Sequence, residues 1–275
     1  GLFRKDEVVP LPGDRVYISI VDFTKKVGFI EEILPRQSQL VRPAVANIDT
    51  VALVVSVKAP APDLMLLDKL LLSAEVNGID AIICINKIDL VEAEEYNRII
   101  DEYKESGYNL ILLSSKANVG FNTLKKAPKD RITVFAGQSG VGKSTILNKI
   151  MDSWIMETGE VSSRIERGKH TTRHAELVEL KDGGYVVDTP GFSSFELAGI
   201  SHTTLETYYP EFSSYFGRCR FTGCSHISEP DCCVKQALTE GLISAGRHKR
   251  YAELYNLLKM QKDNEYRGKN RKGKD

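Results

Sequence analysis

The sequence predicts an α/β fold with a mostly parallel sheet, preceded by a short β region and followed by a cysteine-rich, mainly helical region. Three observations support this prediction. Short apolar runs alternate with helical patterns between residues 51 and 187, and this alternation is typical of a parallel sheet. Strand-like runs bounded by Gly and Pro occur within residues 1–44. After about residue 200 such runs stop, and four of the five cysteines fall within residues 219–233.

Two strands are predicted in the N-terminal region, over residues 15–20 and 28–34, because Pro and Gly flank both runs. So few strands do not make a stable core by themselves. We therefore expect residues 1–44 to form only part of a small β-barrel, without its first strands. Residues 42–44, Arg-Pro-Ala, are typical of a linker.

The region from residue 51 supplies the predicted sheet and its helices. The strands are predicted over residues 51–57, 81–85, 110–113, 132–136, 174–180 and 185–187, and the helices over 63–77, 92–106 and from 143 to about 151. Uninterrupted apolar runs such as residues 51–57 are typical of strands that are buried on both faces. Asp63 is placed to cap the first helix, and Gly78 to end it.

Composition narrows the possible partners. The formal net charge is zero, yet residues 247–275 hold ten Lys and Arg against four Asp and Glu. This basic helical stretch is suited to nucleic acid, although a merely solvated helix fits its charge equally well. No apolar run approaches the roughly 18 residues of a membrane helix, and no secretory leader opens the chain. We therefore expect a cytoplasmic protein with no membrane partner.

Residues 137–144, GQSGVGKS, match the phosphate-binding loop pattern GxxxxGK[ST] and lie between a predicted strand and a predicted helix. The backbone N–H groups of such a loop wrap phosphates, and the helix N-terminus adds positive potential. Lys143 would reach the β- and γ-phosphates, and Ser144 would ligate Mg²⁺. The predicted contacts are Gly137, Gln138, Ser139, Gly140, Val141, Gly142, Lys143, Ser144 and Thr145.

A second phosphate element, DTPG at residues 188–191, follows the loop by some forty residues and matches the DxxG element of GTP-binding proteins. Asp188 would lie beside the Mg²⁺ ion, and the backbone of Gly191 would face the γ-phosphate. The polar stretch 161–173 between the two elements is typical of a switch loop. Thr171 and Thr172 are both candidates to close on the ion and the γ-phosphate, and we favour Thr172.

The base-reading motif NKxD is present as Asn86, Lys87, Ile88 and Asp89, about fifty residues before the phosphate loop rather than after it. The Asp89 carboxylate can accept hydrogen bonds from guanine N1–H and its 2-amino group, a pair that adenine lacks, so GTP is favoured over ATP. Lys87 would lie along the ring, and Asn86 would tie the base loop to the phosphate loop. A second base-contacting element, [ST]-[SA]-K, is matched by Ser114, Ser115 and Lys116. This order is that of a circularly permuted GTPase.

Many GTPases carry a Gln after DxxG to orient the attacking water, but this chain has Phe192. Intrinsic turnover should therefore be slow, and another group or a partner must complete the site. His170 in the switch loop is a candidate for holding water, and contact with RNA or solvent explains it equally well. Two functions remain open: a GTPase stimulated by a partner, or a nucleotide-gated RNA-binding module with negligible turnover.

A metal site is predicted near the C-terminus from the spacing C-x4-C-x-H-x5-C, formed by Cys219, Cys224, His226 and Cys232. Three thiolates and one imidazole suit a structural, tetrahedral Zn²⁺ with no open position. Cys233 is an alternative to Cys232, since adjacent cysteines have nearly the same spacing.

These motifs, in this order, closely resemble the ribosome small-subunit-dependent GTPase A (RsgA) family. The resemblance rests on NKID, SSK, GQSGVGKST, RGKHTTRH, DTPGF and the cysteine–histidine spacing, and it covers nearly the whole chain. It implies an N-terminal OB-fold, here partial, over residues 1–44, a circularly permuted GTPase domain over 45–199 and a zinc-binding domain over 200–275. It also implies hydrolysis of GTP to GDP and phosphate, stimulated by the small (30S) ribosomal subunit during its late maturation, with binding to 16S rRNA.

The resemblance further assigns residues and cofactors. It implies catalytic roles for Lys143, His170 and Thr172, and Phe192 fits the family's hydrophobic replacement of the catalytic Gln. The implied cofactors are one structural Zn²⁺ per chain and Mg²⁺ bound with GTP. We expect a monomer.

Overall fold

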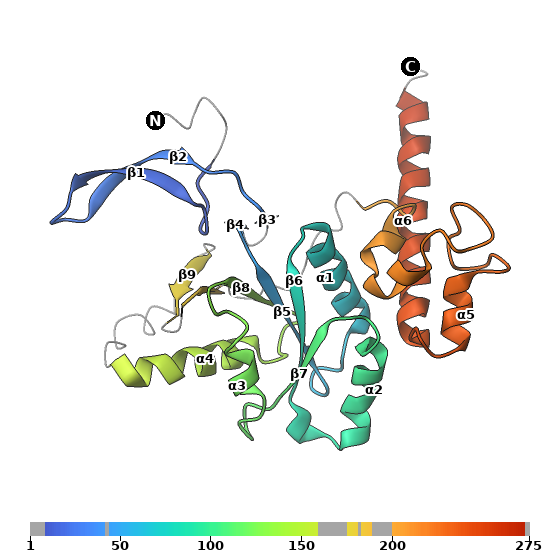
Figure 1. Cartoon of the computed structure of the whole chain (residues 1–275), viewed down its shortest axis with the longest axis horizontal. Coiled ribbons are helices and arrows are strands. Elements are labelled where there is room, and N and C mark those ends of the chain that lie inside the picture. The colour runs from blue at the N-terminus through green and yellow to red at the C-terminus, as the bar shows by residue number, and fades with distance from the viewer. Residues whose placement is uncertain (1–8, 42–43, 159–174, 181–182, 189–199, 273–275) are drawn as a thin grey trace.

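A six-stranded sheet lies at the centre of the protein (Figure 1). The computed structural model describes residues 9–41, 44–158, 175–180, 183–188 and 200–272. The sheet consists of β5 (Thr50–Ser56), β6 (Asp80–Asn86), β7 (Asn109–Leu113), β8 (Ile132–Ala136), β9 (Glu176–Glu179) and β10 (Tyr185–Asp188). The strand order is β7-β6-β5-β8-β10-β9, and among the described residues every pairing is parallel except β9 with β10. The predicted mostly parallel sheet is thus confirmed.

Helices cover both faces of this sheet. They are α1 (Leu64–Val76) and α2 (Ala93–Tyr103) on one face, and α3 (Phe121–Leu124) and α4 (Lys143–Thr158) on the other (Figure 1). Alternate residues of β5 face opposite ways, so Leu53 packs in the core with α1 and α2 whereas Val54 packs with α3 and α4. Every residue of β5 is buried, which explains why residues 51–55 form an uninterrupted apolar run.

The helix boundaries follow local hydrogen bonds. Asp63 Oδ1 accepts from the backbone N–H of Leu66 at 2.8 Å, which confirms the predicted cap of α1. Gly78 follows α1 with φ +63°, a conformation suited to a residue without Cβ. The next helix, α2, stops three residues before the predicted end at residue 106, because the chain turns there and the Ser106 N–H bonds to the Tyr103 carbonyl at 3.0 Å.

The N-terminal part is a pair of antiparallel strands, β1 (Val16–Asp22) and β2 (Val27–Ile33), followed by the short pair β3 (Gln39–Val41) and β4 (Ala44–Ala46). Ala44, predicted to end a linker, therefore begins a strand. The β1–β2 hairpin carries apolar side chains in solvent, with Phe23 in its turn 81% exposed and Phe29 in β2 65% exposed. Asn47, directly after β4, ties β4 to the turn that precedes β1, because its Nδ2 donates to the Gly13 carbonyl at 2.9 Å.

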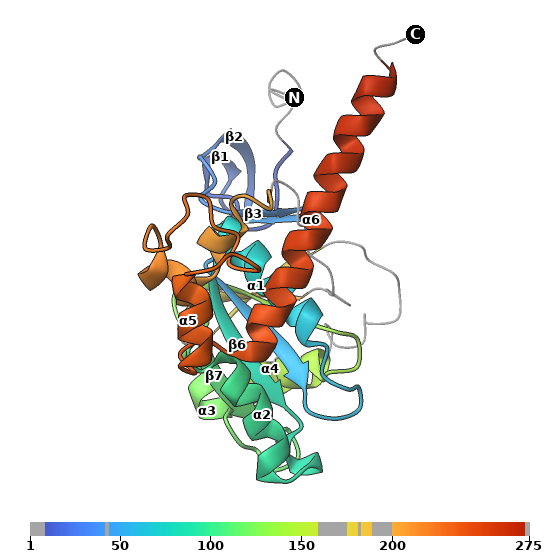
Figure 2. The ribbon, with the colours of Figure 1, turned by 90° about the vertical axis from the view of Figure 1, so that its right-hand side faces the viewer.

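The C-terminal part contains no strand within residues 200–272. It consists of η4 (Leu205–Tyr208), η5 (Pro210–Tyr215), α5 (Cys233–Thr239) and the long α6 (Ala245–Lys272). Figure 2 shows α6 as a long helix whose C-terminal end projects beyond the other labelled elements. The apolar core of this C-terminal part includes Tyr209, Phe212 and Tyr251, together with Leu72 of α1. None of the helices in the described part of the chain is both long and apolar enough to cross a membrane.

A buried cluster of charges joins α6 to the sheet-bearing part. Arg247 Nη1 and Arg250 Nε donate to the two carboxylate oxygens of Asp68, in α1, at 2.7 and 2.6 Å. Asp68 and Arg247 are 0% and 1% exposed. Tyr103 donates its hydroxyl to Asp68, and Glu211 accepts from Arg247. Although burial alone would lower the pKa of Arg247, the carboxylates of Asp68 and Glu211 raise it, so this guanidinium stays charged.

We predict that Asp68→Ala lowers the free energy of unfolding by about 3–5 kcal/mol, because it leaves the buried guanidinium of Arg247 and the partly buried guanidinium of Arg250 without their shared carboxylate. Chemical unfolding followed by circular dichroism measures the loss. The matched control is Asp101→Ala, which removes a surface carboxylate paired with Lys104 and should change stability by less than about 1 kcal/mol. Equal, small losses in both variants would contradict the central role of Asp68.

Candidate active site and metal centre

The two predicted nucleotide motifs meet at the carboxyl ends of the parallel strands. Asn86 ends β6, the phosphate loop follows β8, and β5 lies between them. Although 55 positions separate the partners, Asn86 Nδ2 donates to the Val141 carbonyl at 2.8 Å. Lys87 Nζ donates to the Gly140 carbonyl at 2.7 Å. These two contacts, here called the clasp, bring the inverted motifs into one site and confirm the predicted tie from Asn86.

Two glycines of the loop allow this close approach. Gly137 has φ +144° and Gly142 has φ +101°. A Cβ on Gly137 would lie 2.2 Å from the carbonyl oxygen of Val54, and a Cβ on Gly142 would lie 2.5 Å from Asn86 Nδ2. The loop therefore rests directly on β5 and on the clasp, with no space for a side chain at either position.

Positive charge gathers where the loop ends and α4 begins. Lys143 Nζ donates to the carbonyls of Gly137 and Gln138 at 2.6 and 2.8 Å, so the ammonium lies across the loop. Burial lowers the pKa of Lys143. Ser144 and Thr145 are exposed in the first turn of α4, where backbone N–H groups have no partner within the helix. This arrangement suits phosphate groups.

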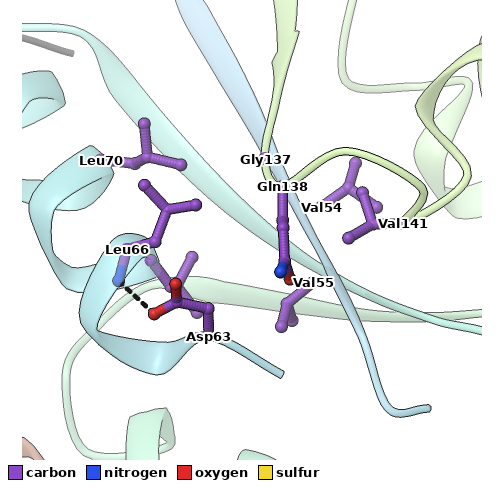
Figure 3. Close-up of a pocket in the computed structure, with 9 residues that line it drawn as sticks. Val54, Val55, Asp63, Leu66, Leu70, Gly137, Gln138 and Val141 are labelled. Atoms are coloured by element: carbon purple, nitrogen blue, oxygen red, sulfur yellow. Dashed lines mark hydrogen bonds between the residues drawn. The ribbon is translucent and has the colours of Figure 1, made fainter. Parts of the chain in front are cut away.

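The other side of the loop packs against α1 (Figure 3). A small pocket there is lined by loop, β5 and α1 residues: Val54, Val55, Asp63, Leu66, Leu67, Leu70, Gly137, Gln138 and Val141. Figure 3 shows the side chain of Gln138 pointing toward Val55, on the α1 side of the loop. Its backbone, rather than its side-chain amide, is therefore the part of Gln138 available to a phosphate.

The predicted base-reading carboxylate, Asp89, is held by a residue that follows the neighbouring strand, β7. Asp89 lies in η2 (Ile88–Leu90), which follows Lys87 in a left-handed conformation with φ +64°. Ser114, after β7, donates its hydroxyl to Asp89 Oδ1 and accepts from the Ala117 N–H at 2.9 Å. The two predicted base elements are thus in direct contact, and Ser114 orients the carboxylate that is expected to meet guanine.

The turn after Ser114 is tied to α4. Lys149 Nζ donates to the Ser115 carbonyl at 2.6 Å, and Lys116 is exposed in the same turn. Two buried polar atoms of the predicted base-reading elements, Asn86 Oδ1 and Ser115 Oγ, have no hydrogen-bond partner among the described residues. Since buried polar atoms are rarely unpaired, they fit groups that a bound nucleotide supplies. Lys149 could not be predicted from the sequence, because a lysine within a helix carries no spacing signal.

The second phosphate element is described only in part. β10 runs parallel to β8, with Val187 opposite Val134, so the backbone of Asp188 lies at the same sheet edge as the phosphate loop. The other predicted switch and phosphate residues lie outside the described residues; they are His170, Thr171, Thr172, Gly191 and Phe192.

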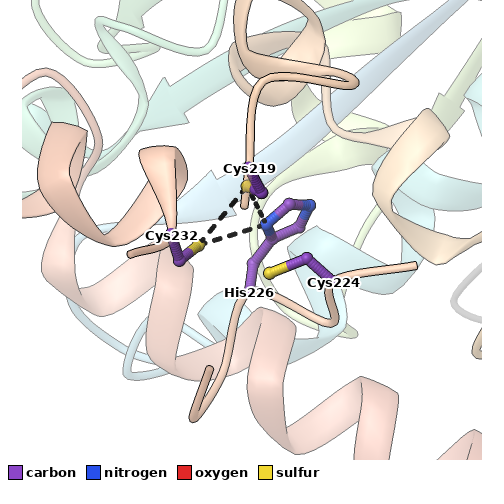
Figure 4. Close-up of side chains that lie close together, drawn as sticks. All are labelled: Cys219, Cys224, His226 and Cys232. Carbon is purple, nitrogen blue, oxygen red and sulfur yellow. Dashed lines mark hydrogen bonds between the residues drawn. The ribbon is translucent and has the colours of Figure 1, made fainter. Parts of the chain in front are cut away.

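The predicted metal ligands gather in one cluster (Figure 4). The ligand atoms of Cys219, Cys224, His226 and Cys232 all lie within 4.8 Å of one another. A tetrahedral ion with metal–sulfur bonds of about 2.3 Å separates two sulfurs by about 3.8 Å. The Cys219 and Cys232 sulfurs are 3.9 Å apart, and His226 Nδ1 lies 3.6 and 3.3 Å from them. The cluster can therefore hold a metal ion.

The structure distinguishes the two adjacent cysteines. Cys232 joins the cluster, whereas the Cys233 thiol donates to the Arg218 carbonyl at 2.9 Å. The loop carrying His226 is fastened by Glu229, which accepts from the N–H and hydroxyl of Ser225 at 2.8 and 2.6 Å. Burial opposes ionisation of Glu229, yet these hydrogen bonds lower its pKa to about 2. A further carboxylate that the sequence analysis missed, Glu206, contacts His226 Nε2.

A family comparison agrees with this arrangement. The family model described as RsgA GTPase matches residues 33–198, more than half of the chain. The chain belongs to the RsgA GTPase family. It is therefore a GTPase, and the clasp explains how the family's inverted motif order yields a single site.

Similar proteins support the same assignment over almost the full length. The small ribosomal subunit biogenesis GTPase RsgA of Ruminiclostridium cellulolyticum is 60% identical over 259 residues, covering 94% of this chain and 85% of that protein. The protein of the same name from Agathobacter rectalis is 46% identical and covers 94% of this chain and 86% of its own length.

Two solved structures share the fold. The crystal structure of YjeQ from Thermotoga maritima has a TM-score of 0.79 at 35% identity, covering 94% of this chain and 87% of that one. YloQ, described as a circularly permuted GTPase, has a TM-score of 0.77 at 36% identity and covers 94% and 84%. Together with the sheet order, these similarities confirm the predicted circularly permuted α/β fold.

We predict that Gly142→Ala weakens nucleotide binding at least 10-fold, because the new methyl group would displace Asn86 and open the clasp. Titration with a fluorescent GDP analogue measures the affinity. The matched control is Gly78→Ala, which also has a positive φ but has no neighbouring atom within 4 Å of the added Cβ. It should lose stability of about 1 kcal/mol without a change in affinity. Similar affinities for the two variants would show that the clasp does not shape the nucleotide site.

Proposed function

We propose that this protein hydrolyses GTP to GDP and phosphate while it acts in biogenesis of the small ribosomal subunit. The observation that carries the proposal is the clasp, because it joins a guanine-reading element to a phosphate loop in the order typical of this family. Relatives that are 42–60% identical bear the name small ribosomal subunit biogenesis GTPase, and this supports the proposed setting.

In the proposed nucleotide complex, the backbone of residues 137–142 surrounds the phosphates and Lys143 neutralises their charge. Asp89 accepts from the guanine edge, Lys87 lies along the ring, and residues 114–116 close the base site. Mg²⁺ would be held by Ser144, Thr172 and Asp188, and Gly191 would contact the γ-phosphate. The ion supplies electrostatic stabilisation of the charge that develops on the phosphate oxygens.

Turnover is proposed to be slow without a partner, because a phenyl ring at Phe192 cannot orient water. His170 and Thr172 would complete the site when the small subunit binds. The alternative, a nucleotide-gated RNA-binding module with negligible turnover, rests on the same Phe192.

For the remaining parts, we propose the boundaries 1–44 for the partial OB-fold, 45–199 for the GTPase domain and 200–275 for the zinc-binding domain. A structural Zn²⁺ held by Cys219, Cys224, His226 and Cys232 would stabilise the last of these. The basic stretch 247–275 is a candidate contact with 16S rRNA. We further propose that the protein is monomeric and works in the cytoplasm.

We predict that Asp89→Asn lowers affinity for GTP about 100-fold or more and raises affinity for xanthosine triphosphate. The physical reason is that an amide can donate to the 2-oxo group of xanthine but cannot accept two guanine donors. Competition against a fluorescent guanine nucleotide measures both affinities. Asp101→Asn, on the surface of α2, serves as control. Unchanged guanine selectivity in the Asp89 variant would remove the assigned base site.

We predict that phosphate release from GTP is slow alone and rises at least 10-fold when purified small subunits are added. Lys143→Ala should abolish turnover in both conditions, because it removes the cation beside the loop, whereas Lys104→Ala, an exposed residue of the α2 end, should behave as wild type. Tight GTP binding with no turnover in the presence of subunits would favour the binding module instead.

A further inference from the structure

The two ring nitrogens of His226 face different partners. Nδ1 lies 3.6 Å from the Cys219 sulfur and 3.3 Å from the Cys232 sulfur, inside the metal cluster. Nε2, on the other side of the ring, contacts a carboxylate oxygen of Glu206. His226 is only 3% exposed, so this carboxylate rather than water meets Nε2. Nδ1 is therefore the nitrogen that faces the cluster, and Nε2 is the nitrogen that faces the carboxylate.

We propose that Glu206 is a positioning residue for the metal ligand His226. By accepting the Nε2–H, its carboxylate fixes the tautomer that leaves the Nδ1 lone pair free for the metal, and it holds the ring in the plane that aims Nδ1 at the sulfurs. A carboxylate in this position also makes the imidazole a better electron-pair donor. This inference rests on the zinc site proposed above.

The surroundings of His226 support an imposed orientation. Its backbone has φ +59°, an uncommon conformation for a residue with a side chain. His248, in α6, donates from its Nε2 to the His226 carbonyl at 2.8 Å. This hydrogen bond ties the backbone of His226 to α6. Phe212 packs edge-on against the imidazole, with ring centroids 5.8 Å apart. These contacts restrict the ring, and Glu206 adds the polar contact that selects its tautomer.

Glu206 reaches the cluster from outside the ligand loop. It lies in η4, twenty positions before His226, and its neighbour Leu205 is fully buried in the C-terminal core. In the chain, Glu206 comes fifteen residues after Gly191 of the DTPG motif. Glu206 therefore contacts the metal cluster from a position in the chain between the nucleotide motifs and the first metal ligand, Cys219.

The first measurement is the zinc content and zinc affinity of the full chain, by competition with a chromophoric chelator. Wild-type protein that binds no zinc would remove the proposed metal site itself. If wild type binds one zinc, Glu206→Ala should weaken that binding about 10–100-fold. Glu206→Gln should lose less, because its amide oxygen still accepts the Nε2–H. Glu240→Ala, which removes a carboxylate bonded to Gln236 in the same part of the chain, should bind zinc as wild type does. Wild-type affinity in Glu206→Ala would overturn the inference.

A double-mutant cycle separates positioning from general stabilisation. His226→Cys supplies a thiolate that has no second nitrogen to orient, so Glu206→Ala should cause no further loss of zinc affinity in that background. An equal loss in both backgrounds would overturn the inference, because it would show that Glu206 does not act through the imidazole. ¹⁵N NMR of the histidines gives an independent reading: His226 should be protonated at Nε2 in the zinc-bound wild type and in Glu206→Gln. Protonation at Nδ1 would also overturn it.

Discussion

The hydrogen bond from Asn86 to the carbonyl of Val141 is the contact on which the proposed nucleotide site depends. The predicted base-reading and phosphate-binding segments are far apart and inverted in the chain, so closeness in sequence does not hold them together. Parallel strands bring their carboxyl ends to one edge of the sheet, and ligands of open α/β sheets bind at this edge. The clasp turns that proximity into a fixed spacing between the predicted base-reading and phosphate-binding elements. Sheet order, rather than chain order, therefore determines the site.

The C-terminal part is attached to the sheet-bearing part by two kinds of interaction. Apolar contacts place Leu72 of α1 in the same core as Tyr209 and Tyr251. The buried charges around Asp68 add a directional restraint, because two guanidinium groups must meet one carboxylate at fixed angles. The metal-cluster residues Cys224 and Cys232 belong to this same apolar core, so the cluster lies within the region that packs against α1. The charges around Asp68 fix where α6 begins.

Much of this architecture could be predicted because the signals are local. Apolar runs located all six strands of the sheet to within two residues, and β8 was predicted with its observed bounds. The ties from Asn86 and the metal cluster followed from residue type and spacing. Contacts such as Lys149 with Ser115, Glu206 with His226 and Arg247 with Asp68 could not be predicted, because they join distant segments without any periodic pattern. Adjacent cysteines were also indistinguishable until their side-chain directions were known.

Asp68 limits where this chain can be shortened. Its partners Arg247 and Arg250 stand in the first turns of α6, near the end of the sequence, yet they neutralise a carboxylate inside the nucleotide-binding half. A truncation before α6 would remove both cations that pair with this carboxylate, and the fold would lose stability for reasons unrelated to RNA. A cut after Leu258, the last residue of α6 in the C-terminal core, would keep both arginines and remove only the projecting basic end. Only such a deletion can report on what the tail itself binds.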